Sequence, residues 1–217
     1  MLNPSLTINI IVLVSGNGTN LAALIRAEQD GRFRRGKDLS GRIAAVISDR
    51  SGAYALTRAE AAGIPSFTET PALALPKAER RRELSGRILR IACEHNADLI
   101  ILAGFLSILE GDIIEAYGGR IINIHPSLLP KFGGPGMYGE RVHRAVIEAG
   151  EKESGCTVHI VDAGTDTGPV LLRRRVPVIA GDNPAALAER IHREEHRAIT
   201  DAAVMMIERL AKRGGES

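Results

Sequence analysis

The chain has no tryptophan, only two cysteines among its 217 residues, and just 3% aromatic side chains. Cys93 and Cys156 lie far apart, match no metal-ligand or redox spacing, and have small or apolar neighbours, so we expect buried free thiols. Free thiols are typical of a reducing compartment, which favours the cytoplasm. The longest apolar runs have only the length of strands, and no basic and apolar leader opens the sequence. We therefore expect neither a membrane span nor export.

A strong charge of either sign is also missing, because 28 basic residues oppose 26 acidic ones and leave a formal charge of +2. Nucleic-acid binding would favour a clustered basic face, whereas this balance suits small anionic ligands. The sequence contains no residue pattern typical of metal or covalent catalysis. The one histidine pair at helical spacing, His192 and His196, does not form an HExxH motif, and no nucleophile elbow surrounds Ser127. We expect no metal.

Apolar strands and amphipathic helices alternate through the first half of the chain. Continuous apolar runs predict buried strands at 8–14, 42–48, 98–105 and 121–125, with a short edge strand at 64–67. Helical patterns between them cover about 21–28, 53–62, 77–96 and 107–116. This alternation predicts an α/β fold with a doubly wound, mostly parallel, Rossmann-like sheet.

The second half has a different pattern. A helix is expected at 140–148, then two strands at 155–161 and 169–178 in an antiparallel hairpin, and a long last helix that runs to about residue 212. We predict one domain over 1–217, with a parallel half at about 8–125 and a smaller hairpin-and-helix part at about 126–212.

The strand at 121–125 ends on polar side chains. Asn123 and His125 project on one face by the period of two, and Pro126 stops regular pairing immediately afterwards. In α/β proteins, ligands bind just beyond the carboxyl ends of such strands. A structural histidine that bonds a carbonyl group is the alternative, and this segment alone does not separate the two.

A glycine-rich turn, Ser-Gly-Asn-Gly-Thr-Asn at 15–20, joins the first strand to the first helix. Glycines let an anion approach the backbone, and the free N–H groups and dipole of the helix attract negative charge. The turn lacks the lysine of a Walker motif and the third glycine of a dinucleotide motif. A plain turn capped by Thr19 or Asn20 is the alternative, and we favour the anion site.

Two acids, Asp162 and Asp166, flank the turn of the expected hairpin, which could fold back toward His125. An aspartate beside a histidine raises the pKa of the imidazole and fixes its tautomer. Such a histidine, next to an amide such as Asn123, can stabilise an oxyanion and donate a proton in acyl transfer. The alternative for either acid is a turn residue that bonds its own backbone.

Four segments together are similar to one known family. The glycine turn at 15–20, Leu-Ala-Gly-Phe at 102–105, Asn-Ile-His-Pro-Ser-Leu-Leu-Pro at 123–130 and Asp-Thr-Gly-Pro at 166–169 occur in the order and spacing of the folate-dependent formyltransferases. The resemblance runs from about residue 8 to residue 210. The third motif is specific for the superfamily, and the glycine turn is typical of the branch that formylates glycinamide ribonucleotide in purine synthesis.

The resemblance implies direct transfer of the formyl group of 10-formyltetrahydrofolate to the substrate amine. Asn123, cationic His125 and Asp166 would form the catalytic group, and of the two acids only Asp166 matches the catalytic position. Substrate contacts are implied for Gly18, Thr19, Asn20, His192 and Glu195. Folate contacts are implied for Arg81, Leu106, Ser107, Ile108, Leu109, Asn123, Val161, Asp162 and Asp166.

The chain departs from the family pattern at three places. His192 stands where relatives have glutamine, Ser107 stands where others have arginine, and the loop at 132–142 is longer than in the short members. These positions concern substrate contacts, folate-tail contacts and the covering loop, respectively.

Three other functions compete with this interpretation. A formyltetrahydrofolate deformylase would be expected to have an N-terminal regulatory domain and no glycine turn, and a methionyl-tRNA formyltransferase would need a C-terminal tRNA-binding domain. A non-catalytic phosphate-binding module would not need Asn123, His125 and Asp166 together. The expected partners are small molecules, and the sequence leaves the oligomeric state open, a homodimer included.

Overall fold

The computed structural model describes residues 6–214, so both ends of the expected domain, 1–5 and 215–217, lie outside the described residues. Its strands are β1 (Leu6–Val14), β2 (Arg34–Arg35), β3 (Leu39–Ser48), β4 (Ser66–Thr68), β5 (Leu99–Leu102), β6 (Ile121–His125), β7 (Glu153–Ile160) and β8 (Val170–Pro177). Its helices are α1 (Thr19–Gln29), α2 (Tyr54–Ala61), α3 (Lys77–Glu94), α4 (Asp112–Ala116), α5 (Glu140–Glu148) and α6 (Pro184–Gly214).

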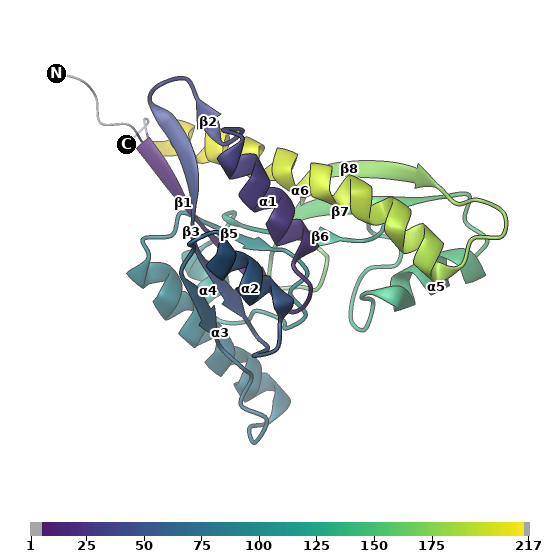
Figure 1. Ribbon diagram of the computed structural model, residues 1–217. Coiled ribbons are helices and arrows are strands. Elements are labelled where there is room, and N and C mark those ends of the chain that lie inside the picture. The colour runs from purple at the N-terminus through teal and green to yellow at the C-terminus, as the bar shows by residue number, and fades with distance from the viewer. Residues whose placement is uncertain (1–5, 215–217) are drawn as a thin grey trace.

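All the strands belong to one sheet with the order β2-β3-β1-β5-β6-β7-β8, and β4 pairs with β3 beside this path (Figure 1). The pairs among β4, β3, β1, β5 and β6 are parallel, whereas β6, β7 and β8 pair in antiparallel fashion. The mostly parallel sheet, the C-terminal hairpin and the long last helix confirm the predicted fold class.

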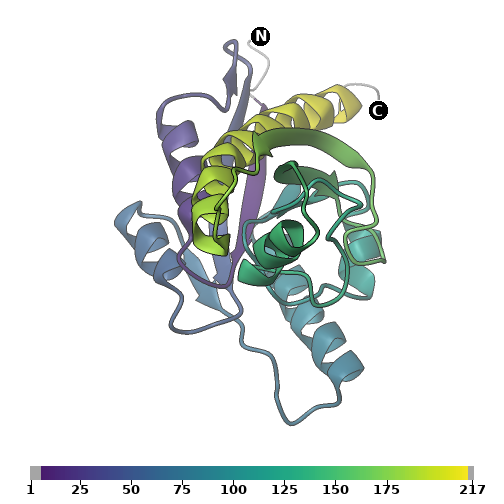
Figure 2. The same ribbon diagram turned by 90° about the vertical axis from the view of Figure 1, so that its right-hand side faces the viewer.

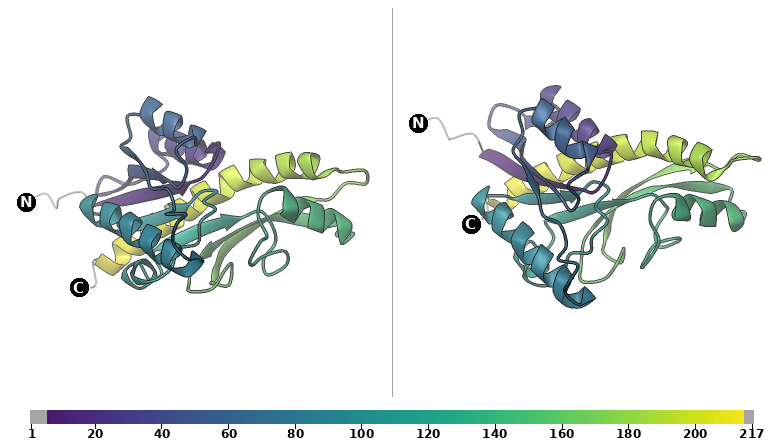
Figure 3. Two further views of the ribbon diagram at one scale, coloured as in Figure 1. Left: turned by 90° about the horizontal axis from the view of Figure 1, so that it is seen from below. Right: turned by 60° about the horizontal axis from the view of Figure 1, so that its bottom comes forward.

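Alternate residues of β1 explain why the sheet has helices on both faces. Ile10, Val12 and Val14 pack in a core with α1, α2 and α6, whereas Ile11 and Leu13 pack with α3 and α4. All five side chains have zero exposure, as expected for a central strand covered on both sides. Figure 3 shows α1 and α2 on one side of the strands and α3 on the other, and Figure 2 shows α6 running alongside β8.

The helix expected at 107–116 begins only at Asp112. Before it, the backbone donors of the loop are taken by distant side chains: the N–H of Leu106 donates to Ser15 Oγ at 2.7 Å and that of Glu110 to Ser85 Oγ at 2.9 Å. These bonds replace those of a helical turn, so the segment stays an irregular loop.

Two smaller expectations need correction. Cys156 is buried, but Cys93 is exposed because it lies outside the stripe of α3 that packs on the sheet. The two-residue strand β2 was not expected, since it has no apolar pattern. In the part of the chain that the structure describes, every helix is too short or too polar to cross a membrane.

The turn between β7 and β8 leaves no room for a side chain at Gly168. A Cβ built there would lie 1.9 Å from the carbonyl oxygen of Ile160, next to the bond from the Ile160 N–H to the Pro169 carbonyl. We expect Gly168→Ala to cost about 1–3 kcal/mol of unfolding free energy, because the hairpin must open to admit the methyl group. Urea unfolding measures this loss. Gly52→Ala is the control, since a Cβ there meets nothing within 4 Å, and equal stability of the two variants would contradict the prediction.

Candidate active site

A cleft of about 880 Å³ opens at the carboxyl ends of β1, β5 and β6. Its walls come from the glycine turn, the loop after β5, the hairpin turn, the start of α3 and the first half of α6. Every residue that the sequence predicted for the site lines this cleft, except Asp162. The Oδ1 atom of Asp162 instead accepts bonds from the Gly164 N–H and the Thr167 hydroxyl, at 2.9 and 2.6 Å, and so stabilises the turn.

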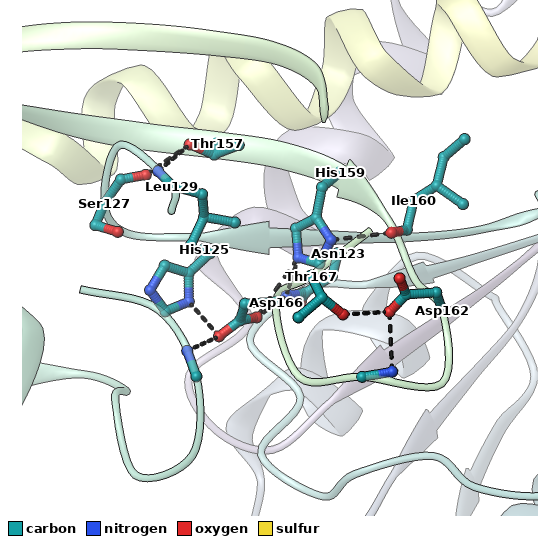
Figure 4. A network of polar contacts seen from close by, with 12 residues as sticks. Asn123, His125, Ser127, Leu129, Thr157, His159, Ile160, Asp162, Asp166 and Thr167 are labelled. Carbon is teal, nitrogen blue, oxygen red and sulfur yellow. Dashed lines mark hydrogen bonds and ion pairs between the residues drawn. The ribbon is translucent and has the colours of Figure 1, made fainter. Parts of the chain in front are cut away.

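The hairpin turn does fold back onto the end of β6 (Figure 4). Asp166 Oδ2 lies 3.4 Å from His125 Nδ1, and Asp166 Oδ1 lies 3.5 Å from Asn123 Nδ2. Asp166 itself has a φ of 58°, a left-handed conformation that aspartate tolerates better than most residues. Its shortest contact is with the backbone, because the Gly134 N–H donates to Oδ2 at 2.9 Å.

The charge of His125 differs from the expectation. Burial lowers the pKa of its imidazole, and the nearby Asp166 carboxylate, which raises the pKa, does not compensate. The net pKa is therefore below 6.5, and the ring is mainly neutral at pH 7. Nε2 lies 2.8 Å from the Phe132 carbonyl, which can only accept, so Nε2 carries the proton.

The pKa of Asp166 is lowered although burial alone would raise it. Burial raises the pKa of this carboxyl, but the hydrogen bond with His159, the electrostatic interaction with the His125 ring and the bond from the Gly134 N–H together lower the pKa by more than burial raises it. The net pKa is below 3.8, so Asp166 is ionised at neutral pH. The site thus contains a fixed anion beside an imidazole that can take up a proton.

His159 belongs to this group although the sequence did not point to it. It lies in β7 directly opposite Asn123, is 2% exposed, and has Nε2 at 3.1 Å from Asn123 Nδ2 and 3.5 Å from Asp166 Oδ1. Its Nδ1 is 3.0 Å from the Ile160 carbonyl and therefore carries a proton. Only the register between β6 and β7 brings these two residues together.

The glycine turn has the geometry of an open helix start. Gly18 precedes α1 with a φ of 69°, and no side chain caps the helix, so neither Thr19 nor Asn20 acts as the alternative expected. A Cβ at Gly18 would lie 2.6 Å from Ala55 Cβ, because α2 packs directly against the turn. Glycine is needed both for this conformation and for this close approach.

Buried polar groups with unused bonding capacity lie beside the turn. Asn20 Nδ2 is 3.4 Å from Glu195 Oε2, which is 3.9 Å from His192 Nε2, and the rings of His192 and His143 meet edge to face. Burial raises the pKa of Glu195, and His192 and Asn20 partly offset this effect. Among the described residues, Asn20 Oδ1 and His143 Nδ1 are buried and have no hydrogen-bond partner. A polar ligand would satisfy them.

The wall formed by α3 and the loop after β5 contains the remaining predicted contacts. Arg81 Nη1 lies 2.6 Å from Glu110 Oε1, so this guanidinium is already paired. Ser107 donates its hydroxyl to Asp49 Oδ2 at 2.7 Å. In the described residues, no group of three histidine, cysteine or acidic side chains could hold a metal ion.

The chain is similar to known proteins over most of its length. The family model described as formyl transferase matches residues 8–203. The chain belongs to the formyl transferase family. It is 39% identical over 188 residues to phosphoribosylglycinamide formyltransferase of Escherichia coli (strain K12), covering 87% of this chain and 82% of that protein.

Two further comparisons place the chain within the formyl transferase family. It is 39% identical over 198 residues to the trifunctional purine biosynthetic protein adenosine-3 of Drosophila melanogaster, covering 91% of this chain but only 14% of that longer protein. The crystal structure of glycinamide ribonucleotide transformylase 1 from Symbiobacterium toebii superposes with a TM-score of 0.82 at 40% identity, covering 93% of this chain and 88% of that one.

The burial of His143 predicts an acid-sensitive fold. Burial, together with the charges of His192 and His125, lowers the pKa of His143 to about 4, and its side chain is only 2% exposed. Its contribution to stability is complete above pH 6.5 and is lost as the pH falls toward 4, because the unfolded chain then binds a proton that the folded chain rejects. At pH 5 we expect a loss of about 2 kcal/mol from this residue.

Urea unfolding at pH 7.5 and pH 5 measures this loss. His143→Gln should show a smaller acid-induced decrease in unfolding free energy than the unsubstituted chain. An equal decrease in both proteins would show that His143 does not cause it.

Proposed function

We propose that the chain transfers the formyl group of 10-formyltetrahydrofolate to the amine of glycinamide ribonucleotide in purine biosynthesis. The observation that carries the proposal is the union, in one cleft, of an open glycine turn and the group Asn123, His125 and Asp166. The Escherichia coli relative, which the chain covers over most of its length, is named for this activity. A phosphate at the turn would place a glycinamide amine toward the carboxyl end of β6.

The substrate phosphate binds at Gly18, Thr19 and Asn20 in this proposal, where the backbone and the dipole of α1 attract an anion. Glu195 and His192 lie next to it and contact the rest of the ribonucleotide, whose hydroxyl groups offer donors to the Glu195 carboxylate and to Asn20 Oδ1. Histidine at 192, where some relatives would have glutamine, offers a ring N–H to the same ligand.

The transfer is direct. The amine nitrogen forms a bond to the formyl carbon, the bond from that carbon to the folate nitrogen breaks, and the proton lost by the amine passes through water to that nitrogen. Negative charge develops on the formyl oxygen meanwhile. The N–H of His125 Nε2, which donates to the Phe132 carbonyl, turns to this oxygen, and the Asn123 amide supplies a second donor by giving up its 3.5 Å bond to Asp166 Oδ1.

Asp166 stabilises positive charge on the His125 ring during the transfer. As the formyl oxygen becomes negative, His125 Nδ1 takes up a proton from solvent water, to which the proton returns when the product leaves, and Asp166 Oδ2 at 3.4 Å accepts its hydrogen bond. The ring is therefore neutral before the reaction and an imidazolium while the oxygen is negative. The folate itself binds along the loop at 106–109, Val161 and Arg81.

Absorbance of the folate product tests the proposal, with the full chain and 10-formyltetrahydrofolate in the presence and absence of glycinamide ribonucleotide. We expect product only when the ribonucleotide is present. Product formed without it would indicate a deformylase that uses water, and no product under either condition would indicate a binding module. Either of these results would overturn the proposal.

Two substitutions test the catalytic group. We expect His125→Ala and Asp166→Asn each to lower kcat by about 10²–10³-fold, because each removes a donor or the anion that supports it at the developing oxyanion. Calorimetric binding of glycinamide ribonucleotide should stay within about twofold, since the phosphate site is separate. Asp112→Asn, an exposed acid at the start of α4, is the control. Full activity of either active-site variant would contradict the assigned role.

A further inference from the structure

The start of α3 presents cations to one side of the cleft. Lys77, Arg80 and Arg81 line it, together with the buried Leu84 one turn further on. The three cationic side chains differ in their hydrogen-bond partners and exposure. Arg80 donates to the carbonyls of Leu73 and Leu75, and Lys77 is exposed, but Arg81 is paired with a carboxylate.

That carboxylate belongs to Glu110, which does not itself line the cleft. Its Oε1 lies 2.6 Å from Arg81 Nη1, and the two side chains are 29% and 27% exposed. A pair so close to water gains little net free energy from its attraction, because water and salt screen both charges. Exchange of one carboxylate for another on Arg81 is therefore inexpensive.

The two ends of the cleft lie on opposite layers of the molecule. The glycine turn and α6 belong to the layer on one face of the sheet, whereas α3 packs on the other face. His125, at the end of β6, lies between them. If the substrate phosphate takes the glycine turn, an anion that reaches Arg81 must come from the second reactant, and a folate has such an anion in the carboxylates of its glutamate tail.

We propose that Glu110 determines the affinity of the cleft for the folate tail by competing with it for Arg81. This inference rests on the proposed function. Until the tail binds, Glu110 takes the place of the ligand carboxylate on Arg81. When the tail binds, it displaces Glu110 from Nη1 or shares the guanidinium with it, and in both cases the negative charge of Glu110 stays close to the tail and weakens its binding.

Removal of this charge should leave the fold unchanged. The loop that carries Glu110 is fixed by the bond from its own N–H to Ser85 Oγ at 2.9 Å, which does not involve the side chain. Glutamine at position 110 keeps an oxygen acceptor of the same length for Arg81. Glu110→Gln therefore changes the charge and little else.

Calorimetry without ribonucleotide tests the inference with two ligands, tetrahydrofolate and tetrahydropteroate, which lacks the glutamate. We expect Glu110→Gln to bind tetrahydrofolate more tightly, by a factor on the order of ten, because a nearby repulsive charge is gone. Its affinity for tetrahydropteroate should not change. In an Arg81→Gln background the gain should disappear, since the contested guanidinium is absent.

Glu79→Gln is the matched control. It removes the same charge from an exposed position in the first turn of α3 that does not line the cleft, so it should leave both affinities unchanged. An equal gain with Glu79→Gln would mean that a general charge effect, and not competition at Arg81, is responsible.

Three other results would overturn the inference. Weaker binding of tetrahydrofolate by Glu110→Gln would show that Glu110 holds Arg81 in place for the ligand. Unchanged binding, or an equal gain for both ligands, would show that Glu110 does not compete with the folate tail for Arg81. If the unsubstituted chain transfers formyl groups to the ribonucleotide, these results leave the proposed function intact. If it binds neither ligand, both proposals fail.

Discussion

The carboxylate of Asp166 is the point at which separate parts of the chain meet. The end of β6 supplies His125 and Asn123, β7 supplies His159, and the loop after β6 supplies the Gly134 N–H. An ionised carboxylate in a half-buried position is unfavourable unless donors surround it. The geometry of the site is thus a consequence of neutralising one anion, and the low pKa of Asp166 shows that the donors outweigh its burial.

At His125, in contrast, burial outweighs the favourable electrostatic contacts. Its ring is 4% exposed, and the cost of burying a positive charge exceeds the attraction of Asp166, so the pKa falls. A permanently cationic ring would attract an oxyanion but would also attract any anion that enters the cleft. In the proposed transfer, a ring that becomes charged only as the formyl oxygen becomes negative would be stabilised chiefly in the transition state, which is the condition for a faster reaction.

Local pattern was sufficient for much of this structure. The apolar run of β1 predicted a strand covered on both faces, and Pro126 after His125 predicted the end of β6, which is found at that residue. The glycine turn was predicted from its position between a strand and a helix, and its contact with α2 at Ala55 gives a second reason for Gly18. In each case the cause lies within a few residues of the feature.

The features that were missed depend on contacts between distant segments. His159 faces Asn123 only because of the antiparallel register of β6 and β7, which no local pattern specifies. The loop at 106–110 is not helical because Ser15 and Ser85, far away in sequence, accept its N–H groups. The pKa of His125 was predicted in the wrong direction because a nearby aspartate can be inferred from sequence, but the extent of burial cannot.

The loop after β6 supplies a backbone carbonyl as hydrogen-bond partner for His125. Phe132 has a φ of 56°, a left-handed conformation that costs a bulky residue of order 1–3 kcal/mol. Its carbonyl accepts the hydrogen bond from the N–H of His125 Nε2. In the proposed reaction, the formyl oxygen takes over this bond. Gly134, two residues further on, donates to Asp166, so movement of this loop would act on both His125 and Asp166.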